Sequence, residues 1–543
     1  MIMNKKLLTT VTLLLSVLCF NVTGQELLPQ PEEDVVKKVY DKDEQKNFVV
    51  IESKTQHEFN PQKTAISNDN DILVNVYEGL FTANPVSLDP QFAIAVDYKI
   101  SRDKKRWQIT LRDDAKFSNG EKITAEDVRY SWLTLLETPN APYASLLDII
   151  RGAKEYREGS GKKEDVGIYA VSESELNIYL NSPTNYLPNV LCHPSFSIIN
   201  KDPTVFSGAY QISNITEDTT VITKNPHYWD AKNVIIENVT FVQSDDIEEN
   251  TALYNNGDVQ WVTGLVTPDR IIDSDAIQVS AQYGISFFFF KNSKNNPSKK
   301  DTGSVWDKKE FRLALLEACP WDQIRSGETV PATTFVYQLQ GYPSVAGYDF
   351  TDSIEAKRKM KEARQMYNIG EDEILPLVFE VSKGSISEQD KQAFIDAFGP
   401  LGVEVSFREL PSYLYFDNVP KSDADVFLYS WIGDFSDPLT FLELFHGGST
   451  MNESGWQNDE YDRLISEAAQ VSSSERYSLL AQAETLLLDE GMIIPISHPI
   501  SFNCIDPKEI GGWYPNAFDV HLFKYMYIKK ENVEIPNLIR FDY

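Results

Sequence analysis

Positive charge is scarce in this sequence of 543 residues. Lysine and arginine together number 50 against 81 aspartates and glutamates, which gives a net charge of −31 at pH 7. Because nucleic acid attracts the opposite charge and no long basic stretch offsets this excess, we expect no nucleic-acid partner. Long apolar runs are also absent after residue 24, so the sequence predicts no membrane span in the rest of the chain.

Cysteine is equally rare, since only Cys19, Cys192, Cys319 and Cys504 occur. So few cysteines cannot form the dense disulfide framework of a small secreted domain, and a chain of this length can build a large core without one. No CxxC spacing indicates a zinc site. We expect the last three to be buried single thiols or to include one disulfide, and the sequence leaves the pair open.

The short motifs of the common enzyme classes are missing as well. The chain has no G-x-S-x-G elbow and no H-E-x-x-H helix, and residues 159–163 lack the full phosphate-loop pattern. The 6 histidines are scattered singly, without metal-ligand spacing. Asp434 and Asp437 resemble the carboxylate pair of a glycosidase, but nothing beside them indicates catalysis. We therefore predict a protein that is not an enzyme and that holds no cofactor or metal.

An export signal is present at the start of the chain. Lys5 and Lys6 precede an apolar run at residues 7–20, and small residues follow at 22–24, which is typical of a cleaved signal peptide over residues 1–24. This predicts a periplasmic protein. An alternative is lipid attachment at Cys19, although Leu18 is bulky where such sites usually have a small residue.

Strand-like and helix-like patterns alternate after an acidic leader at residues 25–46. Thr124 and Asp127 form a capping-box pattern that predicts the start of one helix. No internal repeat is visible, and the mixture predicts an α/β protein of several units. The expected strands are at 48–51, 107–112, 176–180, 238–242 and 286–290, and the expected helices at 72–80, 124–136 and 472–490.

The most informative segment is WIGDFSDP at residues 431–438. It follows an apolar, β-branched and aromatic run at 425–430, and its glycine and proline break regular structure, so Asp434 should lie on a loop at a strand end. A carboxylate among aromatic side chains on such a loop is suited to hold a cation or a peptide's free amino terminus. The alternative is that Asp434 or Asp437 caps a helix that begins near Leu439.

The order of the motifs resembles one known family along nearly the whole chain. That family comprises the extracytoplasmic solute-binding proteins that deliver oligopeptides and dipeptides to ATP-binding-cassette (ABC) importers. Each motif is weak alone, and the resemblance rests on their shared order. The motifs are FNP at 59–61, VYEGL at 76–80, FSNGEKITAEDV at 117–128, APYAS at 141–145, GAY at 208–210, NPHYW at 225–229, FRLA at 311–314, WIGDFSDP at 431–438 and NDEYD at 458–462.

The resemblance implies the two-lobed periplasmic binding protein fold of type II, cluster C, an α/β fold with an extra inserted domain. The implied division gives lobe I residues 47–66, 202–284 and 523–543. Residues 67–201 would form the inserted domain, and residues 285–522 would form lobe II. Ligand would be enclosed when the lobes close around it.

The resemblance also implies a ligand site. In peptide-binding members of this family, the carboxylate that matches Asp434 takes the ligand's ammonium group. The segment with Gln56 and His57, and the strand before Trp431, would pair with the peptide main chain as added strands. The other residues at pocket positions are Gly433, Tyr143, Tyr413 and His521. For Tyr143, Tyr413, Trp431 and His521, ordinary core packing is the alternative.

Departures from the family pattern leave the ligand open. Leu428 stands where some oligopeptide binders have an arginine for the carboxylate of short peptides, and Pro320 interrupts the arginine-bearing helix. We expect an oligopeptide receptor that works with a membrane permease, as a monomer. The alternatives are a receptor for a non-peptide amine or a metal chelate, and a surface or signalling protein that uses the same fold.

Overall fold

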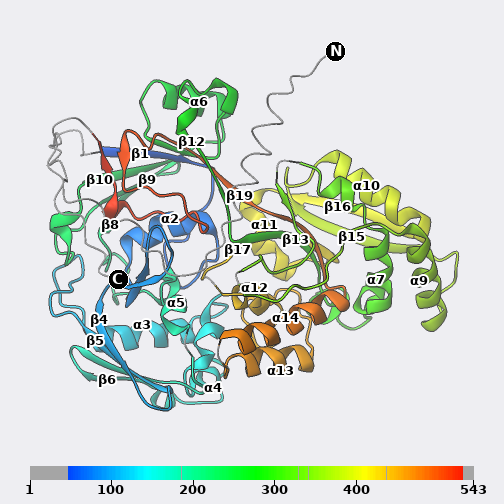
Figure 1. Cartoon of the computed structure of the whole chain (residues 1–543), viewed down its shortest axis with the longest axis horizontal. Helices are drawn as coiled ribbons and strands as arrows, with labels where there is room; N and C mark the ends of the chain where they lie inside the picture. Colours follow the sequence, from blue (N-terminus) through cyan, green and yellow to red (C-terminus); the bar gives the residue numbers. More distant parts are fainter. Residues whose placement is uncertain are drawn as a thin grey trace.

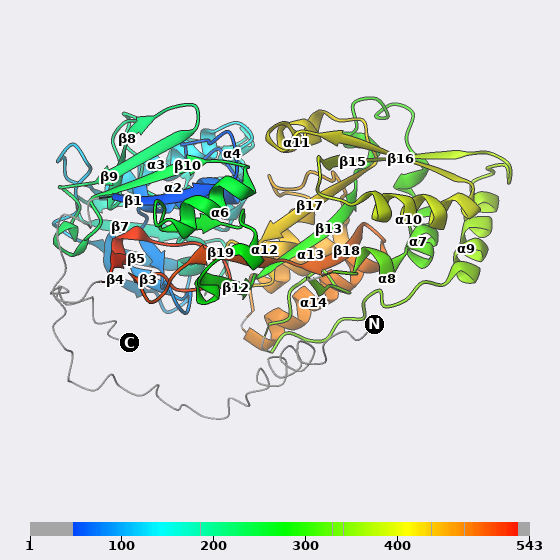
Figure 2. The same cartoon turned by 90° about the horizontal axis from the view of Figure 1, so that it is seen from above.

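The computed structural model describes residues 47–529 except 185, 328, 340, 436 and 472. The predicted signal peptide, the acidic leader and Cys19 lie outside the described residues. Two lobes stand side by side (Figure 2), each with its own central sheet and helices against it. Strands and helices are mixed throughout, which confirms the predicted α/β class.

The first lobe is built on a seven-stranded sheet in the order β12-β19-β11-β1-β10-β9-β8 (Figure 1). Its β1 runs parallel to β10 and β11, and the other pairs are antiparallel. Phe48, Phe241 and Trp261 pack beneath it in a core that also buries Phe523. The strands are β1 (Asn47–Glu52), β8 (Tyr210–Ile215), β9 (Thr219–Lys224), β10 (Asn238–Gln243), β11 (Trp261–Thr263), β12 (Ile277–Ala281) and β19 (Ile500–Ile505).

The second lobe is built on a six-stranded sheet in the order β14-β18-β13-β17-β15-β16. Its central strand, β13, carries four consecutive buried phenylalanines at 287–290, because helices and aromatic side chains cover both of its faces. The strands are β13 (Gly284–Phe290), β14 (Val330–Pro331), β15 (Leu375–Ser382), β16 (Val403–Leu410), β17 (Val426–Ile432) and β18 (Ile493–His498).

Helices pack around this second sheet. The predicted helix at 472–490 is α14, which buries Leu480, Ala483 and Leu487. The helices are α7 (Lys309–Ala318), α8 (Trp321–Ile324), α9 (Ser353–Met366), α10 (Glu388–Phe398), α11 (Ser412–Asn418), α12 (Leu439–Leu442), α13 (Asp459–Ala468) and α14 (Ser473–Asp489).

A four-stranded antiparallel sheet in the order β4-β5-β7-β6 forms the inserted domain. The capping box predicted at Thr124 and Asp127 is present at the start of α3, where the carboxylate accepts the backbone N–H of Thr124 at 2.8 Å. The elements on this side are β4 (Ala95–Ile100), β5 (Arg106–Leu111), β6 (Ile168–Ser172), β7 (Glu175–Tyr179), α3 (Ala125–Glu137), α4 (Ala153–Arg157) and α5 (Leu187–Val190).

Two elements lie elsewhere than the expected domain boundaries suggest. Strand β19 hydrogen-bonds to β11 and β12 in the first sheet, although its residues were assigned to lobe II. Helix α2 (Ser67–Val76) buries Ile72, Leu73 and Val76 in the core of the first lobe, although residue 67 was expected to open the inserted domain. Short contact segments of this kind carry little periodicity of their own, so their partners decide where they belong.

The chain crosses between the two large sheets at two adjacent points among the described residues. Two residues link β12 to β13, and Pro499 alone links β18 to β19. The crossings are joined, because the Gln282 N–H donates to the Pro499 carbonyl at 3.0 Å and His498 Nδ1 lies 2.8 Å from the Gly284 carbonyl oxygen. These two strand connections therefore form a narrow hinge between the lobes.

The smaller elements complete the described fold. They are the antiparallel pairs β2 (Phe81–Ala83) with β3 (Pro90–Phe92) and β20 (Ile510–Gly511) with β21 (Tyr527–Ile528), together with α6 (Ile247–Asn255). Within the described residues, no helix is both long and apolar enough for a membrane crossing. Cys319 and Cys504 are buried and Cys192 is half-buried, and all three are free thiols, as one of the two expectations stated.

Candidate functional site

A cleft of about 1790 Å³ lies where the two lobes and the inserted domain face one another. This volume exceeds the roughly 300–1,000 Å³ of ordinary small-molecule pockets. Both lobes and the inserted domain supply its walls, so a ligand that fills it would touch all three. Of the predicted site residues, the lining includes Gln56, His57, Tyr143, Tyr413, Trp431, Gly433 and Asp434.

Gly433 fixes the course of the loop that carries Asp434. A Cβ at this position would lie 2.5 Å from the Tyr283 ring, so only glycine fits against it. The Gly433 N–H donates to the Tyr283 carbonyl at 2.7 Å, and the next N–H, of Asp434, donates to Thr440 Oγ1 at 2.9 Å. The loop at the end of β17 is thus held from both sides, as a binding loop on a rigid strand requires.

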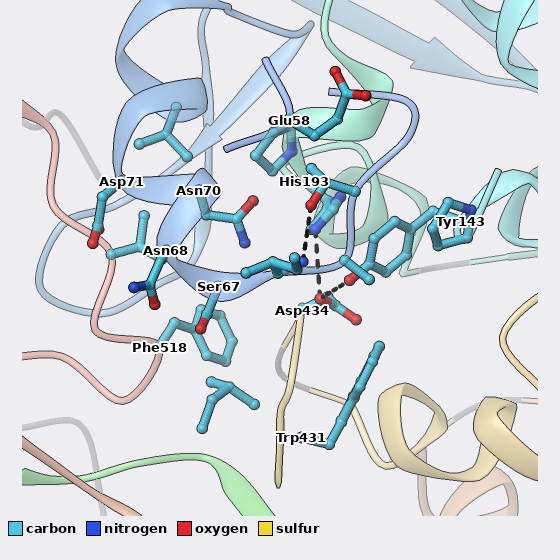
Figure 3. Close-up of a pocket in the computed structure, with 18 of the residues that line it drawn as sticks. Glu58, Ser67, Asn68, Asn70, Asp71, Tyr143, His193, Trp431, Asp434 and Phe518 are labelled. Carbon is cyan, nitrogen blue, oxygen red and sulfur yellow. Dashed lines mark hydrogen bonds and ion pairs between the residues drawn. The ribbon is translucent and has the colours of Figure 1, made fainter. Parts of the chain in front are cut away.

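The Asp434 carboxylate projects into the cleft and meets neutral donors. Tyr143 donates its hydroxyl to Oδ1 at 3.0 Å, and Thr440 donates to Oδ2 at 3.3 Å. Figure 3 shows Tyr143 and His193 converging on this carboxylate, with Trp431 on another side. The side chain is 7 % exposed, and burial raises the pKa of Asp434 to about 7, against the opposing effect of the hydrogen bonds. Among the described residues, no lysine or arginine pairs with it.

His193 completes this group from the inserted domain. Its Nδ1 accepts the backbone N–H of Ser195 at 3.2 Å, which leaves Nε2 to carry the proton of the neutral ring. Nε2 lies 3.5 Å from Asp434 Oδ1 and has no hydrogen-bond partner within the described residues. Burial lowers the pKa of His193 to about 3, so the ring is neutral at physiological pH and the contact is no salt bridge.

Trp431 forms the aromatic wall next to the carboxylate. Its indole Nε1 donates to the Thr440 carbonyl at 3.0 Å, and its ring centroid lies 6.4 Å from that of Tyr143. Asp437 faces away from this role, since its Oδ1 accepts the N–H of Leu439 at 2.9 Å and Arg476 holds both of its oxygens. Asp437 therefore makes a turn contact just ahead of α12, whose N-cap position is Pro438, and Asp434 is the carboxylate in the cleft.

His57 also lines the cleft, in a different electrostatic setting. Its Nδ1 lies 2.9 Å from Asp69 and its Nε2 lies 2.7 Å from Glu52, with the imidazole side chain only 4 % exposed. Burial lowers the pKa of His57, but the two carboxylates outweigh this and raise it to about 9. The ring is therefore a charged, fully paired group.

Two stretches of backbone along the cleft are free to pair with an extended chain. Strand β17 pairs with β13 along its whole length. On its other edge β15 reaches Val426 and Phe427, and the Tyr415 hydroxyl contacts both backbone groups of Leu428, so the open edge begins after Leu428. Residues 53–60, which contain Gln56 and His57, form no strand. Among the described residues, no backbone group accepts the N–H of Gln56 or His57.

Of the last two predicted residues, one lies at the cleft and the other does not. Tyr413 lies on α11 at the cleft, 59 % exposed and without a packing role that would bury it. His521, by contrast, is 3 % exposed and stacks on Trp513 at 4.7 Å, with Trp261 edge-on at 5.1 Å. It lies in the packing of the first lobe and is not part of the described cleft lining, so its predicted place in the pocket wall is wrong.

Sequence reasoning missed His193, Thr440 and Asp71. His193 is a lone histidine far along the chain from Asp434, and only the fold brings them together. Asp71, on α2, lines the cleft, and burial followed by the charges of Asp519 and Glu52 raises its pKa well above the ordinary value. Within the described residues, no group of three or more potential metal ligands is placed to hold an ion.

Comparison with known proteins gives a consistent result. The family model described as bacterial extracellular solute-binding proteins, family 5 middle region, matches residues 89–453. A dipeptide-binding protein of Bacillus subtilis is 26 % identical over 453 residues, which cover 78 % of this chain and 81 % of that protein.

Solved structures extend the similarity to the fold. The murein tripeptide-binding protein of Escherichia coli superposes with a TM-score of 0.78 at 22 % identity, over 89 % of this chain and 98 % of that one. Its unliganded open form gives a TM-score of only 0.62 at 22 % identity, over 91 % of this chain and 98 % of that one. Both comparisons show that the chain shares the fold of that protein.

Proposed function

Because this chain belongs to the bacterial extracellular solute-binding proteins of family 5, we propose that it captures oligopeptides in its cleft and hands them to an ABC importer. The relative from Bacillus subtilis is named for dipeptides and the structural neighbour for a murein tripeptide, which supports a peptide ligand here. No observation favours a non-peptide amine, a metal chelate or a signalling role over this function.

The observation that carries the proposal is the unpaired carboxylate of Asp434. A buried carboxylate without a cationic partner is unfavourable in the ligand-free protein, and its raised pKa reflects that cost. The ammonium group at a peptide's amino terminus supplies the missing charge. In a closed, dry cleft such a charge-assisted pair is stronger than in water.

The main chain of the peptide would pair with the free edges of the cleft. Strand β17 beyond Leu428, and the segment with Gln56 and His57, offer backbone groups to such a chain. This mode reads the backbone that every peptide shares, so it accepts many sequences. Trp431 and Tyr413 then provide adaptable apolar surface for side chains.

Lobe closure would couple capture to delivery. Contacts already cross between the inserted domain and the second lobe, since Thr450 Oγ1 donates to the Pro142 carbonyl and Arg157 donates to the Gly448 carbonyl at 3.2 Å. A ligand that touches both sides favours the closed arrangement by its differential affinity for it. The closed form would dock on a membrane permease.

The remaining parts of the proposal concern location and state. We propose export by the signal peptide at residues 1–24, a monomer in the periplasm, and no catalytic activity. These extend the family's extracellular, solute-binding character to the present chain.

Native mass spectrometry of the freshly purified protein tests the function. We expect a ladder of bound masses that denaturing release and sequencing identify as peptides. An Asp434→Asn variant purified in parallel should carry far less of this ladder. A single non-peptide mass on the native protein, or equal peptide loading of the two proteins, would contradict the proposal.

A further inference from the structure

The buried Nε2–H of His193 has no partner in the described structure, although an unmade hydrogen bond in a dry site is costly. Its Nδ1 is already committed to the Ser195 N–H, so the ring cannot turn this proton elsewhere without losing that bond. The acceptor that it approaches is Asp434 Oδ1, at 3.5 Å. A small displacement brings that distance within hydrogen-bond range.

The two oxygens of Asp434 are unequally occupied. Oδ1 faces both Tyr143 and His193 from the inserted domain, whereas Oδ2 receives only the longer contact from Thr440 on its own lobe. Because a carboxylate oxygen accepts about two hydrogen bonds, Tyr143 and an approaching His193 would fill Oδ1, and Oδ2 would retain capacity for a ligand donor.

We propose that His193 is a positioning residue that donates Nε2–H to Asp434 Oδ1, holds the carboxylate ionised, and leaves Oδ2 for the ligand's ammonium group. This inference rests on the proposed function. It makes selectivity for a free amino terminus depend on both sides of the cleft, since the acid comes from the second lobe and the two groups at Oδ1 come from the inserted domain. The arrangement is complete only when the lobes approach.

No charged group near Asp434 among the described residues stabilises the ionised carboxylate in place of His193. Among the described residues, the titratable groups that face it are Tyr143 and His193. Burial, followed by the charge of Asp434, raises the pKa of Tyr143 well above its usual range, so this hydroxyl also stays a neutral donor. The nearest carboxylate on the loop, Asp437, is paired with Arg476. Neutral donors are therefore the groups that offset the effect of burial on the Asp434 carboxylate.

Two matched substitutions separate the roles of the two ring nitrogens. His193→Asn keeps an acceptor near the Nδ1 position for the Ser195 N–H but places no donor at Asp434. His193→Gln keeps a donor near the Nε2 position but gives up the contact with Ser195. Both remove the ring, so lost packing affects them alike.

The probe is a random-sequence pentapeptide library, in free-amine and N-acetylated forms, with affinity measured by thermal shift from pH 5 to pH 8.5. We expect His193→Asn to bind the free-amine library about 10-fold more weakly at pH 7. The pH at which its affinity rises should lie about one unit higher than in the native protein. His193→Gln should stay within about 3-fold of the native affinity and keep the native pH profile. The small response to the acetylated library should not change with pH.

Several outcomes would overturn the inference. Native-like pH profiles in both variants, or a later rise only in His193→Gln, would show that Nε2–H does not act on Asp434. An equal shift in both would assign the effect to the ring's packing. If the native protein itself fails to prefer the free-amine library, the proposed function fails and the inference falls with it.

Discussion

Two buried ionisable groups line the same cleft in opposite circumstances. His57 lies between Glu52 and Asp69, and its charge is matched inside the protein. Within the described residues, Asp434 faces two hydroxyl donors and a neutral imidazole, and no cation matches its charge. The first group contributes to stability, whereas the second lowers stability until a ligand arrives. The contrast shows how one cleft separates a structural charge from a binding charge.

Removing the paired charge of His57 should have the largest effect on the free energy of unfolding. His57→Gln leaves Glu52 and Asp69 buried without a cation, so we expect the free energy of unfolding to fall by about 3 kcal/mol at pH 7. Urea denaturation followed by circular dichroism measures it. The raised pKa of about 9 means that the native protein holds this stabilisation fully below about pH 6.5, the unfolded value, and loses it as pH rises through 9.

The variant should lack that loss between pH 7 and pH 10, which the native protein shows. Equal pH dependence in the two proteins would mean that His57 is not the charged group described here.

Removing the unpaired charge should affect binding instead. We expect Asp434→Asn to weaken binding of free-amine pentapeptides by about 100-fold, because the ammonium then meets no opposite charge in a desolvated site. Isothermal titration calorimetry measures the affinity, and N-acetylated pentapeptides are the control. A similar affinity of the native protein for both peptide forms would remove the basis for this prediction.

The same substitution should stabilise the empty protein, which reverses the result at His57. Since the pKa of Asp434 is raised to about 7, its destabilising effect is absent at pH 4 and present above pH 7. We expect Asp434→Asn to gain about 1–2 kcal/mol at pH 8 and nothing at pH 4, by urea denaturation of ligand-free protein. A loss of stability at pH 8 would place Asp434 in the same class as His57.

Substitution of Tyr413 should have the smallest effect on stability and affinity. Tyr413 is 59 % exposed on α11, so Tyr413→Ala should change the unfolding free energy by less than about 0.5 kcal/mol. Affinity for pentapeptides should fall only about 3-fold, since one exposed aromatic contact is lost at the cleft mouth. Calorimetry on the two proteins checks both numbers, and a 100-fold loss would make Tyr413 a principal ligand contact.

Local sequence carried enough information to place the Asp434 loop. The apolar strand, the glycine that must approach Tyr283, and the aromatic residues around the acid all lie within a few positions of one another. The capping box at Thr124 and the buried run of β13 are equally local signals. Such features are predictable because their physical cause is contained in the segment itself.

Features assembled from distant segments could not be read in this way. His193 approaches Asp434 only through the fold, and a single histidine has no sequence spacing from which its partner could be predicted. His521 has the residue type expected in an aromatic pocket, yet stacking with Trp513 and Trp261 fills its surroundings. The position of β19 in the first sheet likewise depends on its partners β11 and β12.

The paired crossings at Gln282 and Pro499 restrict the relative motion of the two lobes. Each connection spans one or two residues, and a hydrogen bond ties them together, so sliding or twisting would stretch both at once. The remaining soft movement is rotation about a single axis through that point. The angle between the two halves is then the coordinate that a distance measurement across the cleft would follow.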